Sequence, residues 1–573
     1  MGLVTDLSPP PSTAVATGHR RLLEQLRADG VRYLFGNPGS TEEGLLDELT
    51  RYPDVEYVLG LQEAALVSTA DGYAQASGRP AVVLLHSGAG LGNAIGSIYH
   101  AARRQTPLVV LAGEAGVEYD ALDAHLAVDL VAMARPVTKY AARVNHPSSL
   151  LRLFRRCLKV AATPPRGPVF LAVPQDVLDQ PNEEPVTPTV FPQTAVVPDA
   201  PVVEQAARLL AGARSPVILV GDGVAASGAV DELARFAETW GAGVYGLTAS
   251  ELVMPWTHPL WRGLSGHLSG ETSAATVADA DAVLVCGTYL FPDVFPLTRS
   301  PFRDGAPVVH IDLDAAAIAK NHPVTLGMVS DPRLTLRALT GVLDETMTDA
   351  QHEAAAGRVR SIAEQTARAH AGRLRLDIAE RDRGPLRMSM IAEALARLLP
   401  ADAVVFDESL THSAELTRWL PPTTPGAFFQ TPGGTLGVGI PGAVGAKLAR
   451  PDRTVVGLTG DGGAMYTYQA LWTAAHLGLD VKLVVCHNAS YRLLKENLAA
   501  YRRDDSPDQP YPPFFDLTSP RVSFVRLAEA LGVAAFRLVE PAQVEQALCT
   551  LLGHRGPALL EVVLDRDVTP ARG

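Results

Sequence analysis

The stretch Gly460-Asp461-Gly462-Gly463, taken together with Asn488, decides the predicted fold class and the position of the site. The tetrapeptide follows an apolar, β-rich run at 454–458, and Asn488 follows the next such run at 481–486. A helical pattern lies between the two runs, so they are predicted to be parallel strands of one sheet. The carboxyl ends of parallel strands share one edge, where open α/β sheets bind ligands. Asp461 and Asn488 are therefore expected to converge.

The residue types at this edge suit a hard cation and a diphosphate. Asp461 offers a carboxylate, Asn488 a side-chain carbonyl and Ser490 a backbone carbonyl. Mg²⁺ prefers oxygen ligands and usually takes further ones from phosphates and water. Gly462 and Gly463 let the backbone come close to a diphosphate, and the N-terminus of the next helix favours the anion. An ordinary Asp-Gly turn with an unrelated asparagine is the structural alternative.

The same alternation of strands and helices runs along the whole chain. Continuous apolar runs between amphipathic helical patterns predict parallel sheets that helices cover on both faces. A Pro-rich stretch at 179–201 and a charged, Ala-rich stretch at 346–383 interrupt the pattern. The predicted fold is therefore α/β, with three doubly wound parallel-sheet domains at 15–185, 200–345 and 385–573.

Composition narrows the possible partners and compartment. The chain has 573 residues and a net charge of −13, which argues against general binding to nucleic acid or to anionic membranes. No run reaches the roughly 18 apolar residues of a membrane helix, so no membrane span is expected. The 4 cysteines are far apart and form no CxxC pair, which predicts a cytoplasmic protein without a disulfide framework.

Several segments of the first predicted domain share their order and spacing with one enzyme family. They are Asn37-Pro38-Gly39-Ser40, Leu61-Gln62-Glu63-Ala64, Ala70-Asp71-Gly72-Tyr73-Ala74, His86-Ser87-Gly88-Ala89-Gly90 and Gly92-Asn93-Ala94. Together with Gly460-Asp461-Gly462 and Asn488-Ala489-Ser490-Tyr491, they resemble the thiamine-diphosphate-dependent decarboxylase and carboligase superfamily, and within it most of all the benzoylformate decarboxylases. The likeness extends along nearly the whole chain.

The resemblance implies a cofactor, a metal and a division of labour between domains. Thiamine diphosphate would bind with Mg²⁺ or another divalent cation, held by Asp461, Asn488 and the Ser490 carbonyl. The first domain would bind the pyrimidine and the third the diphosphate, whereas FAD in the central domain stays open. A homodimer or homotetramer with the cofactor at the subunit interface is expected. The implied cofactor contacts are Asn37, Pro38, Gly39, Glu63, Asn93, Thr411, Gly434, Leu436, Asp461, Gly462, Gly463, Asn488, Ser490 and Tyr491.

Three residues are implied to act in catalysis: Glu63, His86 and Ser40. Glu63 would hydrogen-bond the aminopyrimidine and so promote loss of the thiazolium C2 proton. His86 and Ser40 would face the substrate, for proton transfer and carboxylate binding. Without the resemblance, Glu63 reads as an acidic residue in a helix first turn, and His86 as a satisfied histidine at a strand end.

The expected reaction is non-oxidative decarboxylation of a small 2-oxo acid to an aldehyde. Two departures keep a carboligase of the acetolactate-synthase or benzaldehyde-lyase type as the alternative. The segment 289–294 lacks the second histidine of the benzoylformate decarboxylases, and Arg492, Lys495, Glu496 and Asn497 replace smaller or more aromatic residues. One or two of these four could select a polar or acidic substrate. A catalytically silent relative is disfavoured by Glu63, Asp461 and Asn488, and a nicotinamide oxidoreductase by the lack of a GxGxxG turn.

Overall fold

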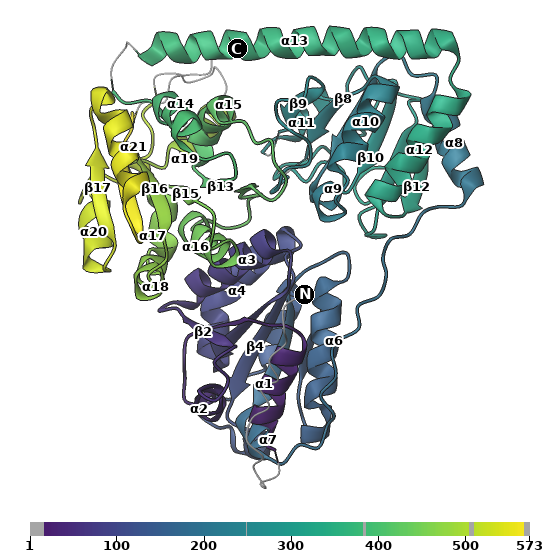
Figure 1. The fold of residues 1–573 in the computed structure, drawn as a ribbon. Helices are drawn as coiled ribbons and strands as arrows, with labels where there is room; N and C mark the ends of the chain where they lie inside the picture. The colour runs from purple at the N-terminus through teal and green to yellow at the C-terminus, as the bar shows by residue number, and fades with distance from the viewer. Residues whose placement is uncertain (1–15, 248, 267, 382–384, 503–508, 567–573) are drawn as a thin grey trace.

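Three parallel sheets make up the architecture, as the sequence predicts (Figure 1). The computed structural model describes residues 16–247, 249–266, 268–381, 385–502 and 509–566. Each sheet has 6 strands, and one sheet falls within each of the three predicted segments. The exact domain boundaries stay predictions, and residues 15 and 567–573 lie outside the described residues.

The first sheet has the order β2-β1-β3-β4-β6-β5. Its strands are β1 (Tyr33–Gly36), β2 (Glu56–Leu59), β3 (Ala81–His86), β4 (Leu108–Glu114), β5 (Ala141–Arg143) and β6 (Val169–Pro174). The helices are α1 (Gly18–Ala28), α2 (Glu43–Leu49), α3 (Glu63–Ser77), α4 (Ser87–Arg103), α5 (Leu130–Ala134), α6 (Leu150–Ala162) and α7 (Gln175–Asp179). Every residue of β4 is buried, which explains its continuous apolar run.

The central sheet has the order β12-β11-β10-β7-β8-β9. Its strands are β7 (Pro216–Val220), β8 (Gly243–Gly246), β9 (Trp261–Leu264), β10 (Ala282–Cys286), β11 (Val308–Asp312) and β12 (Leu326–Val329). The helices are α8 (Ala200–Leu210), α9 (Asp222–Ala226), α10 (Val230–Trp240), α11 (Gly270–Ala275) and α12 (Pro332–Thr346). Read from the other edge, this is the strand order of the dinucleotide-binding doubly wound fold.

The third sheet has the order β14-β13-β15-β16-β18-β17. Its strands are β13 (Val404–Glu408), β14 (Phe428–Gln430), β15 (Val455–Gly460), β16 (Val481–His487), β17 (Ala534–Leu538) and β18 (Ala558–Val563). The helices are α14 (Met388–Leu398), α15 (Ser413–Trp419), α16 (Gly439–Ala449), α17 (Asp461–Thr467), α18 (Ala470–His476), α19 (Arg492–Arg502), α20 (Phe524–Ala530) and α21 (Val544–Gly553). No helix in the described part of the chain is both long and apolar enough to cross a membrane.

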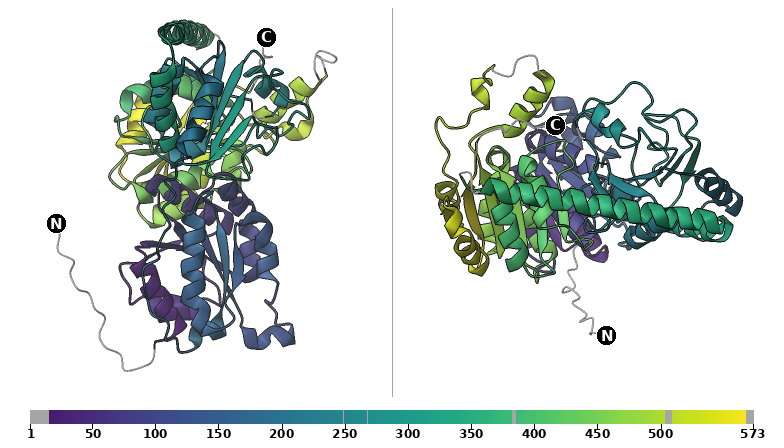
Figure 2. Two further views of the ribbon diagram at one scale, coloured as in Figure 1. Left: turned by 90° about the vertical axis from the view of Figure 1, so that its right-hand side faces the viewer. Right: turned by 90° about the horizontal axis from the view of Figure 1, so that it is seen from above.

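A single helix of 33 residues, α13 (Asp349–Arg381), spans the central and third domains along one side of the molecule (Figures 1 and 2). At its start, Arg358 Nη2 donates to the carbonyl of Trp240 at 2.7 Å. Near its end, the buried Asp377 accepts from Trp419 Nε1 at 2.9 Å and from Arg418. The stretch predicted as helix and linker is thus one long helix, which is bonded to the central domain near its start and to the third domain near its end.

Close helix packing joins the first and third domains. A Cβ atom on Gly72 of α3 would lie 2.3 Å from the carbonyl oxygen of Gly442 on α16. A Cβ on Gly445 would lie 1.9 Å from the carbonyl oxygen of Thr69. Glycine is therefore required at these positions, because any side chain would force the two backbones apart. The contact links the helix that begins at Glu63 with the helix that follows Leu436.

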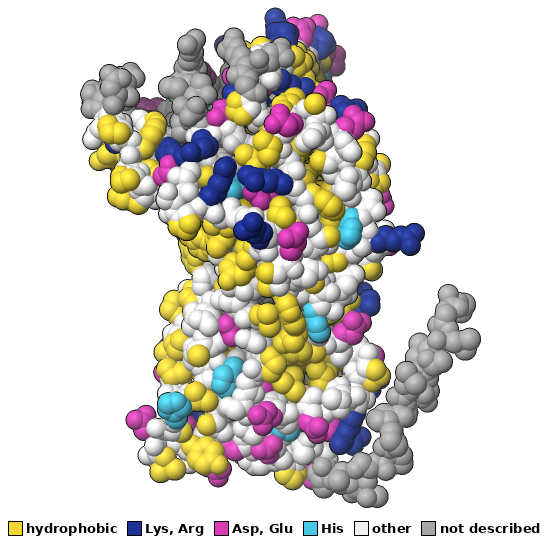
Figure 3. All heavy atoms as spheres, turned by 90° about the vertical axis from the view of Figure 1, so that its left-hand side faces the viewer, with side chains coloured by type: hydrophobic (Ala, Val, Ile, Leu, Met, Phe, Trp, Pro, Cys, Tyr) yellow, Lys and Arg dark blue, Asp and Glu magenta, His cyan; other side chains and the backbone are white. Residues whose placement is uncertain are grey.

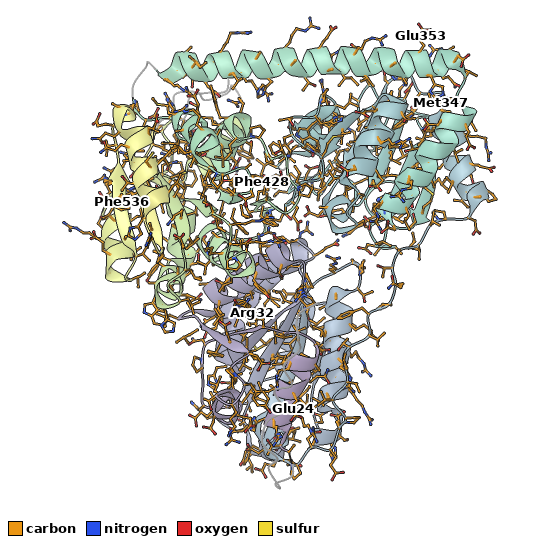
Figure 4. The ribbon with its side chains drawn as sticks, viewed as in Figure 1. Glu24, Arg32, Met347, Glu353, Phe428 and Phe536 are labelled. Atoms are coloured by element: carbon orange, nitrogen blue, oxygen red, sulfur yellow. The ribbon has the colours of Figure 1, made fainter. Side chains whose placement is uncertain are left out.

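The central and third domains meet at strand β14. The ring of Phe428 lies 6.0 Å from that of Trp256, and Gln430 N donates to the carbonyl of Ser250 at 2.8 Å. Figure 4 labels Phe428 at this junction, with side chains of both domains around it. The central domain is therefore packed against β14, the outer strand of the sheet in which β15 and β16 precede the predicted metal ligands.

Candidate active site

Glu63 lies at the edge of the first sheet, as the first residue of α3. Its carboxylate is 7% exposed and accepts from Asn37 Nδ2 and from Asn93 Nδ2, each at 2.9 Å. The helix begins here because Gln62 caps it, accepting from the backbone of Ala65 at 2.8 Å. Asn37 follows β1, and β1 and β3 form the point where the strand order reverses. Three predicted site residues are thus joined at a topological switch point.

His86 ends β3 on the other side of this switch point. Its Nδ1 lies 3.1 Å from Glu42 Oε2 and 3.2 Å from Thr41 Oγ1. The ring lies against Gly39, where a Cβ would stand 2.0 Å from His86 Cγ. Burial raises the pKa of Glu42, while hydrogen bonds from Thr41 and His86 act in the opposite direction. Pro38 and Ser40, on the same loop, are exposed.

Asp461 and the segment after β16 converge, as expected from the parallel strands. Asp461 is 6% exposed; its Oδ1 accepts from Gly462 N at 2.7 Å and its Oδ2 from Ala489 N at 2.5 Å. The side-chain oxygen of Asn488 accepts from Ser490 N at 3.0 Å. Burial is the largest influence on Asp461 and raises its pKa. Asp461, Asn488 and Ser490 therefore lie at one edge of the sheet.

The two glycines after Asp461 allow close packing at this edge. A Cβ on Gly462 would lie 2.7 Å from the ring of Tyr491, and one on Gly463 would lie 3.0 Å from Thr459 Oγ1. The site would therefore lose its shape if either position carried a side chain. Among the described residues, no group of three or more His, Cys, Asp or Glu side chains is placed to hold a metal. The predicted set has one carboxylate, so its other ligands would be amide and backbone oxygens.

Glu408, at the end of β13, organises the loop that carries Leu436. Its carboxylate is 1% exposed and accepts from the backbone nitrogens of Gly437, Val438 and Gly439 at 2.6, 3.1 and 2.8 Å. These nitrogens precede or begin α16, whose unpaired N–H groups need such an acceptor. Burial raises the pKa of Glu408, and the hydrogen bonds oppose that rise. The loop from Gly434 to Leu436 is held by this carboxylate.

A cavity of about 610 Å³ lies beside this loop. Thr411, Gly434 and Leu436 line it from the third domain, together with Leu493 and Glu496 of α19. Ala249, Leu264 and Ser265 line it from the central domain. Among the described residues, none from the first domain contributes to the lining. The predicted site residues therefore form two groups within one chain, at the first and third sheets.

Comparisons with known proteins agree with this arrangement. Family models for thiamine pyrophosphate enzymes match the chain three times: the N-terminal TPP-binding domain at 16–133, the central domain at 203–339 and the C-terminal TPP-binding domain at 411–562. The chain belongs to the thiamine pyrophosphate enzyme family.

Individual relatives cover nearly the whole chain. Benzoylformate decarboxylase of Pseudomonas aeruginosa is 32% identical over 95% of this chain and 98% of that protein. Acetolactate synthase isozyme 3 large subunit of Escherichia coli is 29% identical over 94% and 92%. The solved structure of a 4-hydroxybenzoylformate decarboxylase from Rhodococcus jostii superimposes with a TM-score of 0.83 at 26% identity, covering 97% of this chain and all of that one. The predicted family resemblance and fold are therefore confirmed.

Membership makes this chain a thiamine-diphosphate-dependent enzyme, a lyase or a carboligase, whose substrates are small 2-oxo acids. The relatives include both decarboxylases and synthases, so the family alone does not assign the reaction. The roles of the individual site residues stay predictions from the sequence. The structure of this thiamine pyrophosphate enzyme adds the positions of those residues and their hydrogen-bond partners.

The segment 289–294, without the second histidine of the benzoylformate decarboxylases, lies at a different cavity of about 520 Å³. Tyr289 and Asp293 line this cavity together with Asp312, Lys320 and Arg103. It opens at the switch point between β7 and β10, where a doubly wound sheet binds nucleotides. FAD binding by this thiamine pyrophosphate enzyme stays an open prediction at that position.

Arg492 of α19 is already paired. Its Nε lies 3.0 Å from Glu496 Oε1, one helical turn away, and Glu496 rather than Arg492 lines the 610 Å³ cavity. The positive charge that suggested an acidic substrate is therefore offset within the same helix.

Two residues of this site went unnoticed in the sequence. Glu408 and Glu42 carry no motif of their own, and each acts through backbone or side-chain partners distant in the chain. The available signals were a carboxylate at the end of a mainly apolar strand, for Glu408, and a carboxylate two residues after the predicted site residue Ser40, for Glu42. Both signals are common on protein surfaces.

Proposed function

We propose that the chain catalyses non-oxidative decarboxylation of a 2-oxo acid to an aldehyde, with thiamine diphosphate and Mg²⁺ or a similar divalent cation. His86 is the observation that supports this choice over the other reactions of the family. Release of an aldehyde needs a proton, and an imidazole at the same switch point as Glu63 can supply it. The identity to benzoylformate decarboxylase over 95% of the chain adds to this support.

The proposed metal ligands are Asp461, Asn488 and the Ser490 carbonyl. Their oxygens are hard donors, which fits Mg²⁺. Thr411, Gly434 and Leu436 would contact the cofactor from the wall of the 610 Å³ cavity. Gly462, Gly463 and Tyr491 would complete this half of the cofactor site. Pro38 and Gly39, on the loop after β1, would contribute to the other half.

Thiamine diphosphate supplies an electron sink for the carbon that loses CO₂. Glu63 would hold a proton at its carboxylate, with Asn37 and Asn93 fixing both oxygens in place. The exposed Ser40 would orient the substrate carboxylate, and His86 would move the product proton. These roles use positions that the structure brings to one edge of the first sheet.

The complete site is proposed to form between two copies of the chain. Within one chain, the described first-domain residues do not reach the lining of the 610 Å³ cavity. Large apolar side chains at Leu61, Met465 and Tyr466, within about five positions of Glu63 or Asp461 in sequence, are exposed. Hydrophobic side chains also gather where the first domain meets the third on the face in Figure 3. A homodimer or homotetramer would cover such surfaces.

The proposed substrate carries an apolar group next to its 2-oxo acid. Leu264, Leu410, Leu436 and Leu493 line the cavity, and the charge of Arg492 is offset by Glu496. A cytoplasmic location is proposed as well, because Cys157, Cys286, Cys486 and Cys549 are all free thiols.

The test is incubation with thiamine diphosphate, Mg²⁺ and a panel of 2-oxo acids, with CO₂ and organic products measured. An aldehyde in equal amount to CO₂ would support the proposal, and it would name the substrate. CO₂ without an aldehyde, or no CO₂ from any acid despite bound cofactor, would contradict it.

A carboligase is the second candidate. The absence of histidine from 289–294 favours it, because slower protonation leaves more time for attack on a second carbonyl. The acetolactate synthase relatives point the same way. A 2-hydroxyketone as main product, in the same incubation, would decide for this candidate.

A further inference from the structure

Thr41, Glu42 and His86 form a hydrogen-bonded group at the edge of the first sheet, where His86 is proposed to face the substrate. The Thr41 hydroxyl lies 2.5 Å from Glu42 Oε1, and His86 Nδ1 lies 3.1 Å from Glu42 Oε2. The Glu42 side chain is 2% exposed, whereas the His86 side chain is 24% exposed. The carboxylate therefore lies inside the protein and the imidazole reaches the surface of the site.

This geometry selects one tautomer of His86. Thr41 has a single hydroxyl proton, and it donates that proton to Glu42. When Glu42 is ionised, Thr41 Oγ1 and Glu42 Oε2 can only accept from the imidazole, so the proton of a neutral ring lies on Nδ1. Nε2 is left with its lone pair, and no hydrogen bond to Nε2 occurs among the described residues.

Two glycines hold this group in place. A Cβ on Gly39 would meet the His86 ring at 2.0 Å, and a Cβ on Gly113 would meet Glu42 Oε1 at 1.9 Å. The ring and the carboxylate are thus each backed by a position that only glycine can occupy. The imidazole and the carboxylate therefore each pack closely against a glycine backbone.

Resting on the proposed function, we propose that Glu42 is a positioning residue for His86. It keeps Nδ1 protonated, presents Nε2 to the substrate and places a negative charge beside the ring when Nε2 gains a proton. Nε2 takes that proton from water and gives it to the carbon that has lost CO₂, so each turnover consumes one proton. His86, held by Glu42, thereby performs the proton transfer in a chain whose segment 289–294 contains no histidine.

The kinetic test compares Glu42→Gln with Glu43→Gln, the neighbouring exposed glutamate of α2. Glu42→Gln should lower kcat about tenfold to a hundredfold and change KM by less than about twofold, since general acid–base catalysis contributes about 10²–10⁴-fold. Glu42→Asp should restore part of kcat because it keeps the charge. Thr41→Val should have a smaller effect in the same direction, and it serves if Glu42→Gln fails to fold. Equal kcat for Glu42→Gln and Glu43→Gln would overturn the proposal.

A second readout needs neither substrate nor cofactor. In ¹⁵N-histidine spectra, with His86 assigned by its loss in His86→Asn, the wild-type ring should be the Nδ1-protonated tautomer. An Nε2-protonated ring would overturn the positioning role. If no 2-oxo acid is turned over but the Nδ1 tautomer is found, the proposed reaction fails while the arrangement around His86 stands.

Discussion

The first and third sheets have the same topology and different chemistry. Counted from the start of each domain, both have the strand order 2-1-3-4-6-5, and both reverse between their first and third strands. At the first sheet, this edge carries Glu63 and His86, each held by side chains. At the third, it carries Asp461 and Glu408, each held by backbone N–H groups. The topology supplies an edge for ligands, and the residues on it decide the chemistry.

The difference matters for how each edge responds to substitution. A side-chain carboxylate fixed by two amides can exchange a proton without moving the backbone. A carboxylate fixed by backbone nitrogens holds a loop, so its loss changes the shape of a binding site. We expect the first edge to control the rate and the third to control cofactor binding.

The largest expected effect is a fall in kcat at Glu63 with no loss of cofactor binding. Glu63→Gln should keep thiamine diphosphate bound and lower kcat by about 10²–10⁴-fold, because the amide cannot exchange the proton. Glu56→Gln, at an exposed position on β2, is the matched control and should retain full activity. Calorimetry and steady-state kinetics together measure both quantities. Full turnover by Glu63→Gln would show that the Glu63 carboxyl at the first-sheet edge takes no part in catalytic proton transfer.

The reverse behaviour is expected at the third edge. Asp461→Ala should weaken Mg²⁺-dependent binding of thiamine diphosphate by at least about 10–100-fold, the range seen when metal-site partners are lost. Asp452→Ala, an exposed residue of the same domain, should bind normally. Unchanged affinity of Asp461→Ala in calorimetry would refute the metal role.

The contact between the two domains should affect stability more than chemistry. Gly445→Ala places a Cβ 1.9 Å from the Thr69 carbonyl oxygen, and such overpacking costs about 1–3 kcal/mol. Gly341→Ala, on α12 with open space around its Cβ, should be neutral or slightly stabilising. Chemical denaturation measures both. A neutral Gly445→Ala would mean that α3 and α16 are not in fixed contact.

The smallest effect is expected at Arg492. The Arg492 and Glu496 side chains are 15% and 37% exposed. Pairs one helical turn apart on a helix contribute about 0.3–0.5 kcal/mol, so Arg492→Ala should change stability little. Since Glu496 offsets the charge, kcat/KM for acidic relative to apolar 2-oxo acids should change less than about twofold. Arg368→Ala, in a more exposed pair of the same spacing on α13, is the control. A selective fall in kcat/KM for acidic 2-oxo acids would instead indicate that Arg492 lines the substrate pocket.

The sequence predicted the sheets and the convergence of Asp461 with the Asn488 segment, because both follow from local patterns and parallel topology. It could not predict the network around Glu42, since 44 positions separate Glu42 from His86. Nor could it separate the cavity lined by Thr411 from the one lined by Tyr289, because cavities depend on how domains pack. Local periodicity carries no such long-range information.

The most direct test of the division between the two edges is the exchange rate of the C2 proton of bound thiamine diphosphate, measured by NMR in deuterated buffer. At saturating cofactor and Mg²⁺, Glu63→Gln should slow this exchange by about 10²–10⁴-fold. Asp461→Ala should need far more cofactor and metal, yet approach the wild-type rate once saturated. Normal exchange in Glu63→Gln, or slow exchange in fully loaded Asp461→Ala, would contradict the division.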